Sequence, residues 1–172
     1  ADTYSILLRG AELLLLDQHA VHERILVHRF QTEARSGQSQ LLALPLELRL
    51  HPAEAERLQE IWGELAELGF SLASPSASLL EVRGIPPLLD TGEAREFLRD
   101  ALAEKGEGMT PLLNMMSCKG AIKAGQRLSR DEALALLKQW LATPDKEYCP
   151  HGRPAVLVFG ASELERMFKR KT

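Results

Sequence analysis

Apolar and polar positions alternate in short runs at the start of the chain. Residues 4–8 and 12–16 are rich in leucine, and Arg9-Gly10-Ala11 separates them. Two short apolar runs joined by a glycine-containing turn predict a β-hairpin. From residue 18 to about 34 the apolar positions recur at helical spacing, and Ser36-Gly37 ends the pattern. The first part of the chain is therefore predicted to be a hairpin followed by a helix.

The middle of the chain mixes strand and helix patterns. Residues 41–50 alternate in part and contain Pro45, which favours an edge strand because proline cannot donate to a ladder. Pro52 opens a helix that Gly69 ends. The remaining predictions here are strands at 70–73 and 79–85 and a helix at 93–105.

The last third is predicted to be mainly helical. Thr110-Pro111 starts a helix that carries Cys118, and Ser129 with Glu132 forms a capping box for a helix ending near Ala142. We expect a buried strand at 155–159 and a last helix capped by Ser162 and Glu165.

These elements predict an α+β fold with two lobes. Residues 51–108 would form a lobe inserted into a second lobe, which residues 1–50 and 109–172 build together. The run at 104–108, with two glycines between charged residues, is the best candidate for a linker.

Composition narrows the class of protein. With 172 residues, 45% of them hydrophobic, the chain can bury a sizeable core. A net charge of −3 means that any binding of nucleic acid would need a local basic patch. No apolar run approaches the ~20 residues of a membrane span, and the start has no signal-peptide pattern. Two cysteines 31 positions apart suit reduced thiols or ligands, so a cytoplasmic fragment of a longer protein is expected.

Three short segments hold the side chains that suit a metal site. In the first, His19 and Glu23 are four residues apart and lie on one face of the predicted helix. The simpler interpretation is a solvated helix start with Asp17 as its N-cap. In the others, Cys149 and His151 share a rigid Pro/Gly turn, and Cys118 lies in an apolar helix, where a core thiol is the simpler interpretation. Together, imidazole, thiolate and carboxylate suit zinc or manganese.

Basic residues follow the second of these segments. Lys119, Lys123 and Arg127 recur every four residues, which predicts a basic stripe on a helix beside the metal site. Most such stripes are only solvated, but little acidic residue is interleaved here, and the stripe could hold a phosphate backbone. Arg170 belongs to a second basic group at the C-terminal end.

Taken in order, the segments resemble a known family. They read Asp17-Gln18-His19-Ala20 with Glu23, then Ser117-Cys118-Lys119, then Cys149-Pro150-His151-Gly152-Arg153-Pro154, then Phe168-Lys169-Arg170. This order is similar to that of the C-terminal domain of the mismatch-repair protein MutL, in the subgroup that nicks DNA. The resemblance spans nearly the whole chain.

The resemblance implies a metal-dependent endonuclease that nicks one strand of duplex DNA. Manganese would be the activating ion, and zinc would occupy a regulatory or structural position. Asp17, His19 and Glu23 would be catalytic. Those three residues, Cys118, Cys149 and His151 would hold metal, and Lys119, Lys123, Arg127, Arg153 and Arg170 would contact DNA.

The resemblance also implies partners: a homodimer formed through the lobe that contains both chain ends, an ATPase region on the same protein, and the mismatch-recognition protein MutS acting through the full-length protein. Gln40, Leu44 and Pro45 resemble the Gln-x-x-x-x-Pro segment that binds the replication sliding clamp, and extended apolar peptides of this kind suit a groove. An ordinary edge strand is the alternative.

The sequence departs from the family pattern in ways that keep a second hypothesis open. His28 stands where the first motif has its second glutamate, and Lys119 replaces an arginine. A lost carboxylate changes metal preference or affinity. The chain could therefore be a dimerisation and clamp-binding module with a zinc ion and no nuclease activity. A metal-dependent hydrolase of small substrates is disfavoured, since no nucleophile motif is present.

Overall fold

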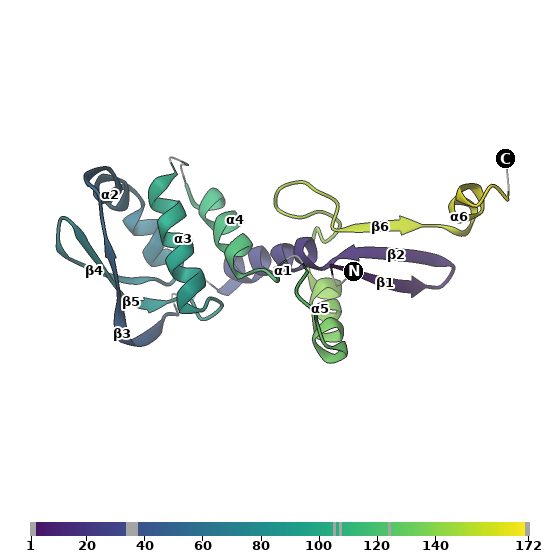
Figure 1. Cartoon of the computed structure of the whole chain (residues 1–172), viewed down its shortest axis with the longest axis horizontal. Coiled ribbons are helices and arrows are strands. Elements are labelled where there is room, and N and C mark those ends of the chain that lie inside the picture. Colours follow the sequence, from purple (N-terminus) through teal and green to yellow (C-terminus); the bar gives the residue numbers. More distant parts are fainter. Residues whose placement is uncertain (1–2, 34–37, 105, 107, 124, 171–172) are drawn as a thin grey trace. The chain divides into compact units, whose positions relative to one another are not determined.

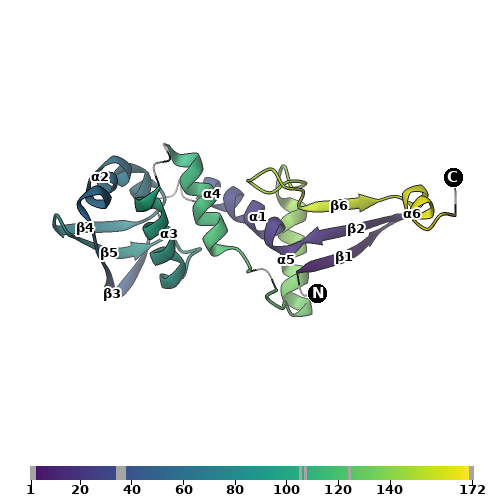
Figure 2. The same cartoon turned by 45° about the horizontal axis from the view of Figure 1, so that its top comes forward.

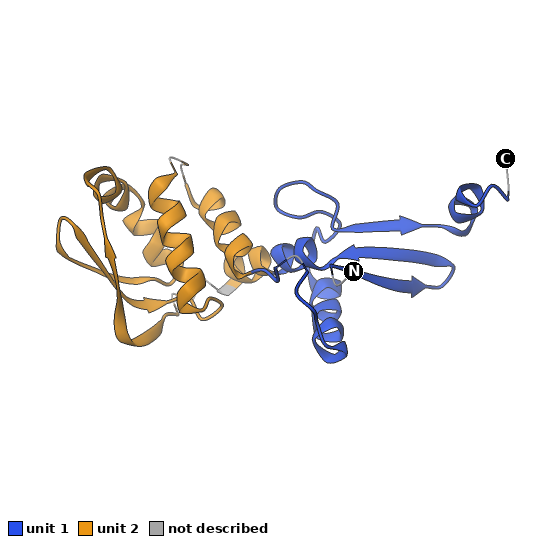
Figure 3. Cartoon of the chain, in the orientation of Figure 1, with its two compact units in different colours: residues 1–25, 121–172 blue, residues 26–120 orange. Residues whose placement is uncertain are grey.

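The computed structural model describes residues 3–33, 38–104, 106, 108–123 and 125–170. It confirms the α+β class (Figure 1). The chain divides into two compact units (Figure 3): unit 1 comprises residues 1–25 and 121–172, and unit 2 comprises residues 26–120. Helix α1 (Gln18–Glu33) begins in unit 1 and ends in unit 2.

Unit 1 is built on a three-stranded antiparallel sheet. Strands β1 (Tyr4–Arg9) and β2 (Glu12–Asp17) form the predicted hairpin, and Gly10 takes the positive φ of 62° that the two-residue turn requires. Strand β6 (Val156–Phe159) pairs with the other edge of β2, so the three strands lie side by side in the order β1-β2-β6 (Figure 2).

One hydrophobic core holds unit 1 together. Alternate residues of β2 point into it, where they meet the first turns of α1 and one face of α5 (Arg130–Ala142). The predicted capping box of α5 is confirmed, because Ser129 accepts from the Glu132 amide and Glu132 accepts from the Ser129 amide. The buried members of this core are Leu14, Leu16, Ala20, Val21, Ile25, Leu136, Trp140, Cys149 and Ala155.

Two predictions for the C-terminal segment are wrong. Strand β6 was expected to be buried, but Leu157 and Val158 are 47% and 42% exposed, since β6 is an edge strand of this sheet. Helix α6 (Ala161–Met167) begins after Gly160, which has no side chain to cap it. Ser162 therefore lies within the first turn of α6 and not at its N-cap position, where a side chain would cap the free amides of the helix start.

Unit 2 contains a second antiparallel sheet. Strands β3 (Gln40–Arg49), β5 (Leu79–Ile85) and β4 (Ser71–Ser76) follow in that order, which confirms β3 as an edge strand. Leu48, Leu80 and Val82 share one face of the sheet and are fully buried. The helices of this unit are α2 (Pro52–Glu67), α3 (Thr91–Ala103) and α4 (Met109–Gly120).

The inserted unit is larger than the sequence predicts. It spans 26–120 rather than 51–108, because β3 pairs with β5 and α4 packs on α3. The linker expected at 104–108 lies partly outside the described residues. Within the described part of the chain, every helix is too short or too polar to cross a lipid bilayer.

Candidate metal centre

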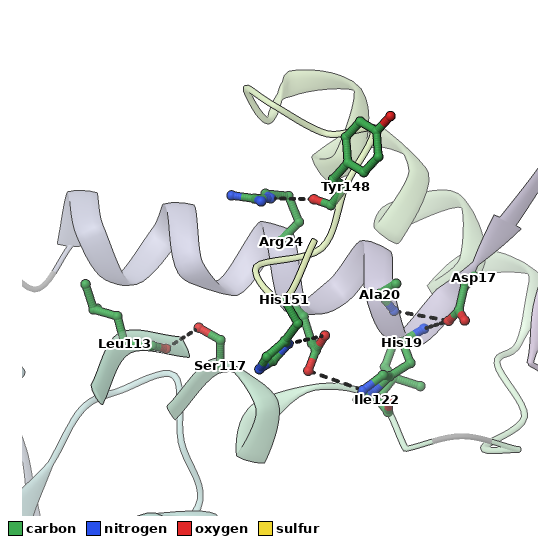
Figure 4. Close-up of polar contacts among 10 residues, drawn as sticks. Asp17, His19, Ala20, Arg24, Leu113, Ser117, Ile122, Tyr148 and His151 are labelled. Carbon is green, nitrogen blue, oxygen red and sulfur yellow. Dashed lines mark hydrogen bonds and ion pairs between the residues drawn. The ribbon is translucent and has the colours of Figure 1, made fainter. Parts of the chain in front are cut away.

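A buried carboxylate marks the candidate centre in unit 1. Glu23 lies on the second turn of α1 and is 1% exposed. Its Oε1 is 3.3 Å from Nε2 of His19, and its Oε2 is 3.6 Å from Nδ1 of His151 (Figure 4). A carboxylate removed from water requires compensation from charge or hydrogen bonds. Here the groups that face it are two imidazoles.

The backbone of a distant residue orients the His19 ring. Nδ1 of His19 lies 2.8 Å from the carbonyl oxygen of Ile122 (Figure 4). The Ile122 N–H donates to Nδ1 of His22 at 3.0 Å. A carbonyl can only accept, so Nδ1 of His19 must carry the proton of the hydrogen bond. In the neutral ring, Nε2 therefore presents a lone pair toward Glu23.

This tautomer leaves two acceptors facing each other. Nε2 of His19 and Oε1 of Glu23 lie 3.3 Å apart, and the buried Oε1 has no hydrogen-bond partner. Two lone pairs at that distance need a proton or a cation between or beside them. In metal-binding histidines, one ring nitrogen commonly donates to a carbonyl while the other ligates, which is the arrangement of His19.

The other donors come from the loop that precedes β6. Cys149 is 1% exposed and belongs to the core of unit 1, whereas the His151 side chain is 40% exposed. The Cys149 amide donates to the Arg153 carbonyl at 2.8 Å, and the Gly152 amide donates to the Cys149 carbonyl at 2.9 Å. Gly152 has a φ of 80°, which a side chain would strain. The loop is therefore a closed turn with a fixed shape.

The donor set fits a divalent transition-metal ion. Glu23, Cys149 and His151 each place a ligand atom within 4.8 Å of the others. Carboxylate, thiolate and imidazole are the ligands of zinc sites, and the unsatisfied Oε1 of Glu23 is the kind of buried group that a cation would satisfy. The sequence prediction brought these residues together from segments more than 120 positions apart.

Asp17 does not join this group of donors. Its Oδ1 accepts hydrogen bonds from the amides of His19 at 3.0 Å and Ala20 at 3.1 Å (Figure 4). Asp17 thus caps α1, as the simpler interpretation of the sequence expected, and such a cap typically stabilises a helix by about 1 kcal/mol. A metal or catalytic role for Asp17 stays a prediction.

Cys118 lies in the other unit. It is on α4, half-buried, and follows the fully buried Ser117, whose hydroxyl donates to the Leu113 carbonyl at 2.7 Å. Its assignment as a metal ligand stays a prediction from the family pattern.

The prediction that one helix carries Lys119, Lys123 and Arg127 as a stripe is wrong, and contact of these residues with DNA stays a prediction. Helix α4 ends at Gly120, and both backbone groups of Ile122 bond to histidines of α1 instead of continuing the helix. Lys123 then enters a turn, in which the Gln126 amide donates to the Lys123 carbonyl at 3.0 Å. Lys123 and Arg127 consequently lie in a connecting segment of unit 1.

Lys119 is engaged in unit 2 by acidic residues of α3. Its Nζ lies 2.5 Å from Asp100 and 3.8 Å from Glu96. The hydrogen bond to Asp100 is the main cause that raises the pKa of Lys119 above its usual value. Binding of a phosphate by Lys119 would therefore have to displace Asp100.

The remaining predicted binding residues are on the surface. Arg153 is exposed on the loop that carries His151, and Arg170 is exposed after α6. In β3, Gln40 and Pro45 are exposed, and Leu44 is 83% exposed where the pairing with β5 shifts register between Leu41 and Leu46.

Sequence reasoning missed two residues that shape the centre. Ile122 acts through its backbone, and no residue pattern indicates such a contact. Arg24 donates from Nε to the Tyr148 carbonyl at 2.7 Å (Figure 4). Its position directly after Glu23 was the only sequence signal available.

The chain is similar to proteins of a known family. Residues 1–128 match the family described as the MutL C terminal dimerisation domain. Relatives named DNA mismatch repair protein MutL include that of Syntrophomonas wolfei, 37% identical over 98% of this chain and 30% of the relative. That of Heliobacterium modesticaldum is 39% identical over 94% of this chain and 26% of the relative. The chain thus spans less than a third of the length of these relatives, and it belongs to the MutL C-terminal dimerisation domain family.

Proposed function

We propose that this chain is a homodimerising, metal-dependent endonuclease domain that nicks one strand of duplex DNA in mismatch repair. The observation that carries the proposal is the buried Glu23 carboxylate, which faces two imidazoles and lies near the thiol of Cys149. A packed core would avoid such a group unless it bound something, because its burial costs free energy.

The residues of the centre have different roles in the proposed reaction. Glu23, His19, Cys149 and His151 would hold the divalent ion, and a role of Cys118 as a ligand rests on the family pattern alone. When bound, manganese supplies Lewis acidity toward the phosphodiester and lowers the pKa of water, and zinc occupies a regulatory or structural position. Arg153, exposed beside His151, orients a phosphate through its planar fork. Asp17 adds negative charge at the start of α1.

An apolar sheet face supports the homodimer. Tyr4, Ile6 and Leu8 occupy alternate positions of β1 and are 53%, 68% and 80% exposed. Side chains at alternate positions share a face, so this strand presents three large apolar groups together. Exposed apolar patches of this kind mark protein interfaces. A second copy of the same face would bury them in a two-fold contact.

The bulged edge of β3 supports binding of the sliding clamp. Leu44 and Leu41 are 83% and 76% exposed, although they lie within a strand. The pairing shift between Leu41 and Leu46 releases this part of the strand from β5. An extended segment with free apolar side chains can dock in a groove of a partner.

His28 favours a second candidate function, a dimerisation and clamp-binding module with zinc and without nuclease activity. The residue replaces the second glutamate of the family motif and is half-buried on α1. The centre then has one carboxylate fewer to balance the charge of two divalent ions.

Nicking of supercoiled plasmid DNA in manganese separates the two candidates. The full chain is compared with E23Q, D17N and the control E12Q, which neutralises an exposed carboxylate at the hairpin turn. D17N is informative because asparagine caps a helix as well as aspartate does, so the change removes charge and keeps the cap. The ATPase region is supplied as a separate protein if the chain alone is inactive.

The expected result is open circles with wild type and E12Q and loss of nicking with E23Q. Loss with D17N as well would assign Asp17 to the reaction, and retained nicking would leave it as a cap. Absence of nicking by wild type, even with the ATPase region present, would refute the nuclease and favour the second candidate. Reversion of His28 to glutamate would then be tested.

A further inference from the structure

The two sides of the candidate centre come from separate elements. His19 and Glu23 lie on α1, whereas Cys149 and His151 lie on the loop before β6. Metal affinity depends on donor positions to within fractions of an ångström. The contact that sets the distance of the loop from α1 therefore also sets the spacing of the donors.

The loop is closed on itself by contacts within its own backbone. Besides the bonds within the turn, Tyr148 and Pro154 form an isolated bridge, and the Ala155 amide donates to the Glu147 carbonyl at 2.8 Å. The base of the loop is tied to the end of β2 by the Asp17 amide, which donates to the Ala155 carbonyl at 3.0 Å. Packing fixes Cys149 in the core, but His151 lies at the exposed tip.

Arg24 links α1 to this loop directly. Its Nε donates to the Tyr148 carbonyl at 2.7 Å, which is one peptide bond before Cys149 (Figure 4). The guanidinium carries a full charge, and hydrogen bonds from charged donors are about twice as strong as neutral ones. Since Tyr148 is bridged to Pro154, holding its carbonyl restrains both arms of the loop and so the position of His151.

We propose that Arg24 is a positioning residue for the metal centre, which it serves by holding the Cys149–His151 loop against α1. The inference rests on the proposed metal-binding function. The charge of Arg24 makes the direction of the expected change in metal affinity informative. A cation beside a metal site repels the metal, so an arginine that contributed only charge would weaken binding, and its removal would strengthen it. A positioning role predicts the opposite.

Titration with Co²⁺, followed by the thiolate-to-cobalt charge-transfer absorption of Cys149, measures the effect. The variants are R24M, which keeps the stem but loses the donor and the charge, and R24K, which keeps a charged donor. R9M is the matched control, because Arg9 is an exposed arginine paired with Glu12 at the hairpin turn. Thermal unfolding in EDTA establishes that each variant is folded.

We expect R24M to bind Co²⁺ roughly 10–100-fold more weakly than wild type, the loss typical of an outer-shell partner. R24K should recover part of the affinity, and R9M should match wild type. Binding by R24M that equals or exceeds that of wild type would overturn the inference and leave the metal centre intact. If wild type itself gives no thiolate absorption with Co²⁺, the metal centre and this inference both fail. If R24M does not fold, R24Q is measured in its place, because it removes the charge and shortens the donor. Full Co²⁺ affinity in a folded R24Q would also overturn the inference.

Discussion

Replacing Glu23 by glutamine tests the centre most directly, because it keeps the shape and removes the charge. In the metal-free protein, Oε1 of Glu23 faces Nε2 of His19 at 3.3 Å without a hydrogen bond. A glutamine amide can donate to that nitrogen. One such bond is worth about 1 kcal/mol. We expect metal-free E23Q to unfold with a free energy equal to that of wild type or about 1 kcal/mol higher.

In zinc, wild type should become more stable than E23Q. A ligand at 100 times its Kd adds about 2.7 kcal/mol to the free energy of unfolding. For a chain of this size, 1 kcal/mol shifts Tm by about 2–4 °C, so wild type should gain roughly 5–11 °C. E23Q should gain little, since a neutral amide is a poor ligand for zinc beside thiolate and imidazole.

Circular dichroism melts of wild type, E23Q and the control E12Q, in EDTA and in zinc, measure both effects. E12Q should follow wild type, because the Glu12 side chain is partly exposed and pairs with Arg9 at the turn of the described hairpin. The reasoning is refuted if E23Q loses several kcal/mol in EDTA and still gains the full zinc shift. That result would make Glu23 a structural partner of the histidines and not a ligand.

Three further predictions concern the surfaces. Ile6→Asp places a charge on the exposed face of β1, so sedimentation should show monomers. The melting temperature of the variant should stay close to that of wild type. Leu44→Ala should change the free energy of unfolding by less than about 0.5 kcal/mol, since the side chain is 83% exposed, and should abolish binding of the sliding clamp in a pull-down. Asp100→Asn should cost about 0.5 kcal/mol in urea unfolding, because both members of the ion pair with Lys119 are partly exposed. The pKa of Lys119 is raised in the folded state, so this difference should be present below pH 10.5 and shrink as the pH rises through that raised pKa.

Local sequence signals predicted the elements well. The glycine between two leucine-rich runs encodes the β1–β2 hairpin, and the Ser129–Glu132 box starts α5, because both depend on residues within a few positions of each other. The same holds for β3, where Pro45 removes a donor and so excludes a central strand. The identities of the donors in the centre were also visible in the sequence.

Features that depend on distant residues were not predictable from local patterns. The regular spacing of Lys119, Lys123 and Arg127 suggested one helix, but α4 ends at Gly120. The histidines of α1 take the backbone groups of Ile122, and a helix cannot continue through a residue whose amide and carbonyl are bonded elsewhere. The prediction that β6 is buried was wrong for the same reason, because burial of this strand depends on whether another strand pairs with its outer edge.

The sequence by itself determined which chemical groups the centre contains, since side-chain identity needs no folding. Only the tertiary structure decided their roles. It gave His19 the tautomer that directs a lone pair at Glu23, and it placed Arg24 on the carbonyl before Cys149. Each of these roles depends on a hydrogen bond to a backbone group, and every residue carries the same backbone groups. Such contacts leave no pattern in the sequence and exist only once the chain has folded.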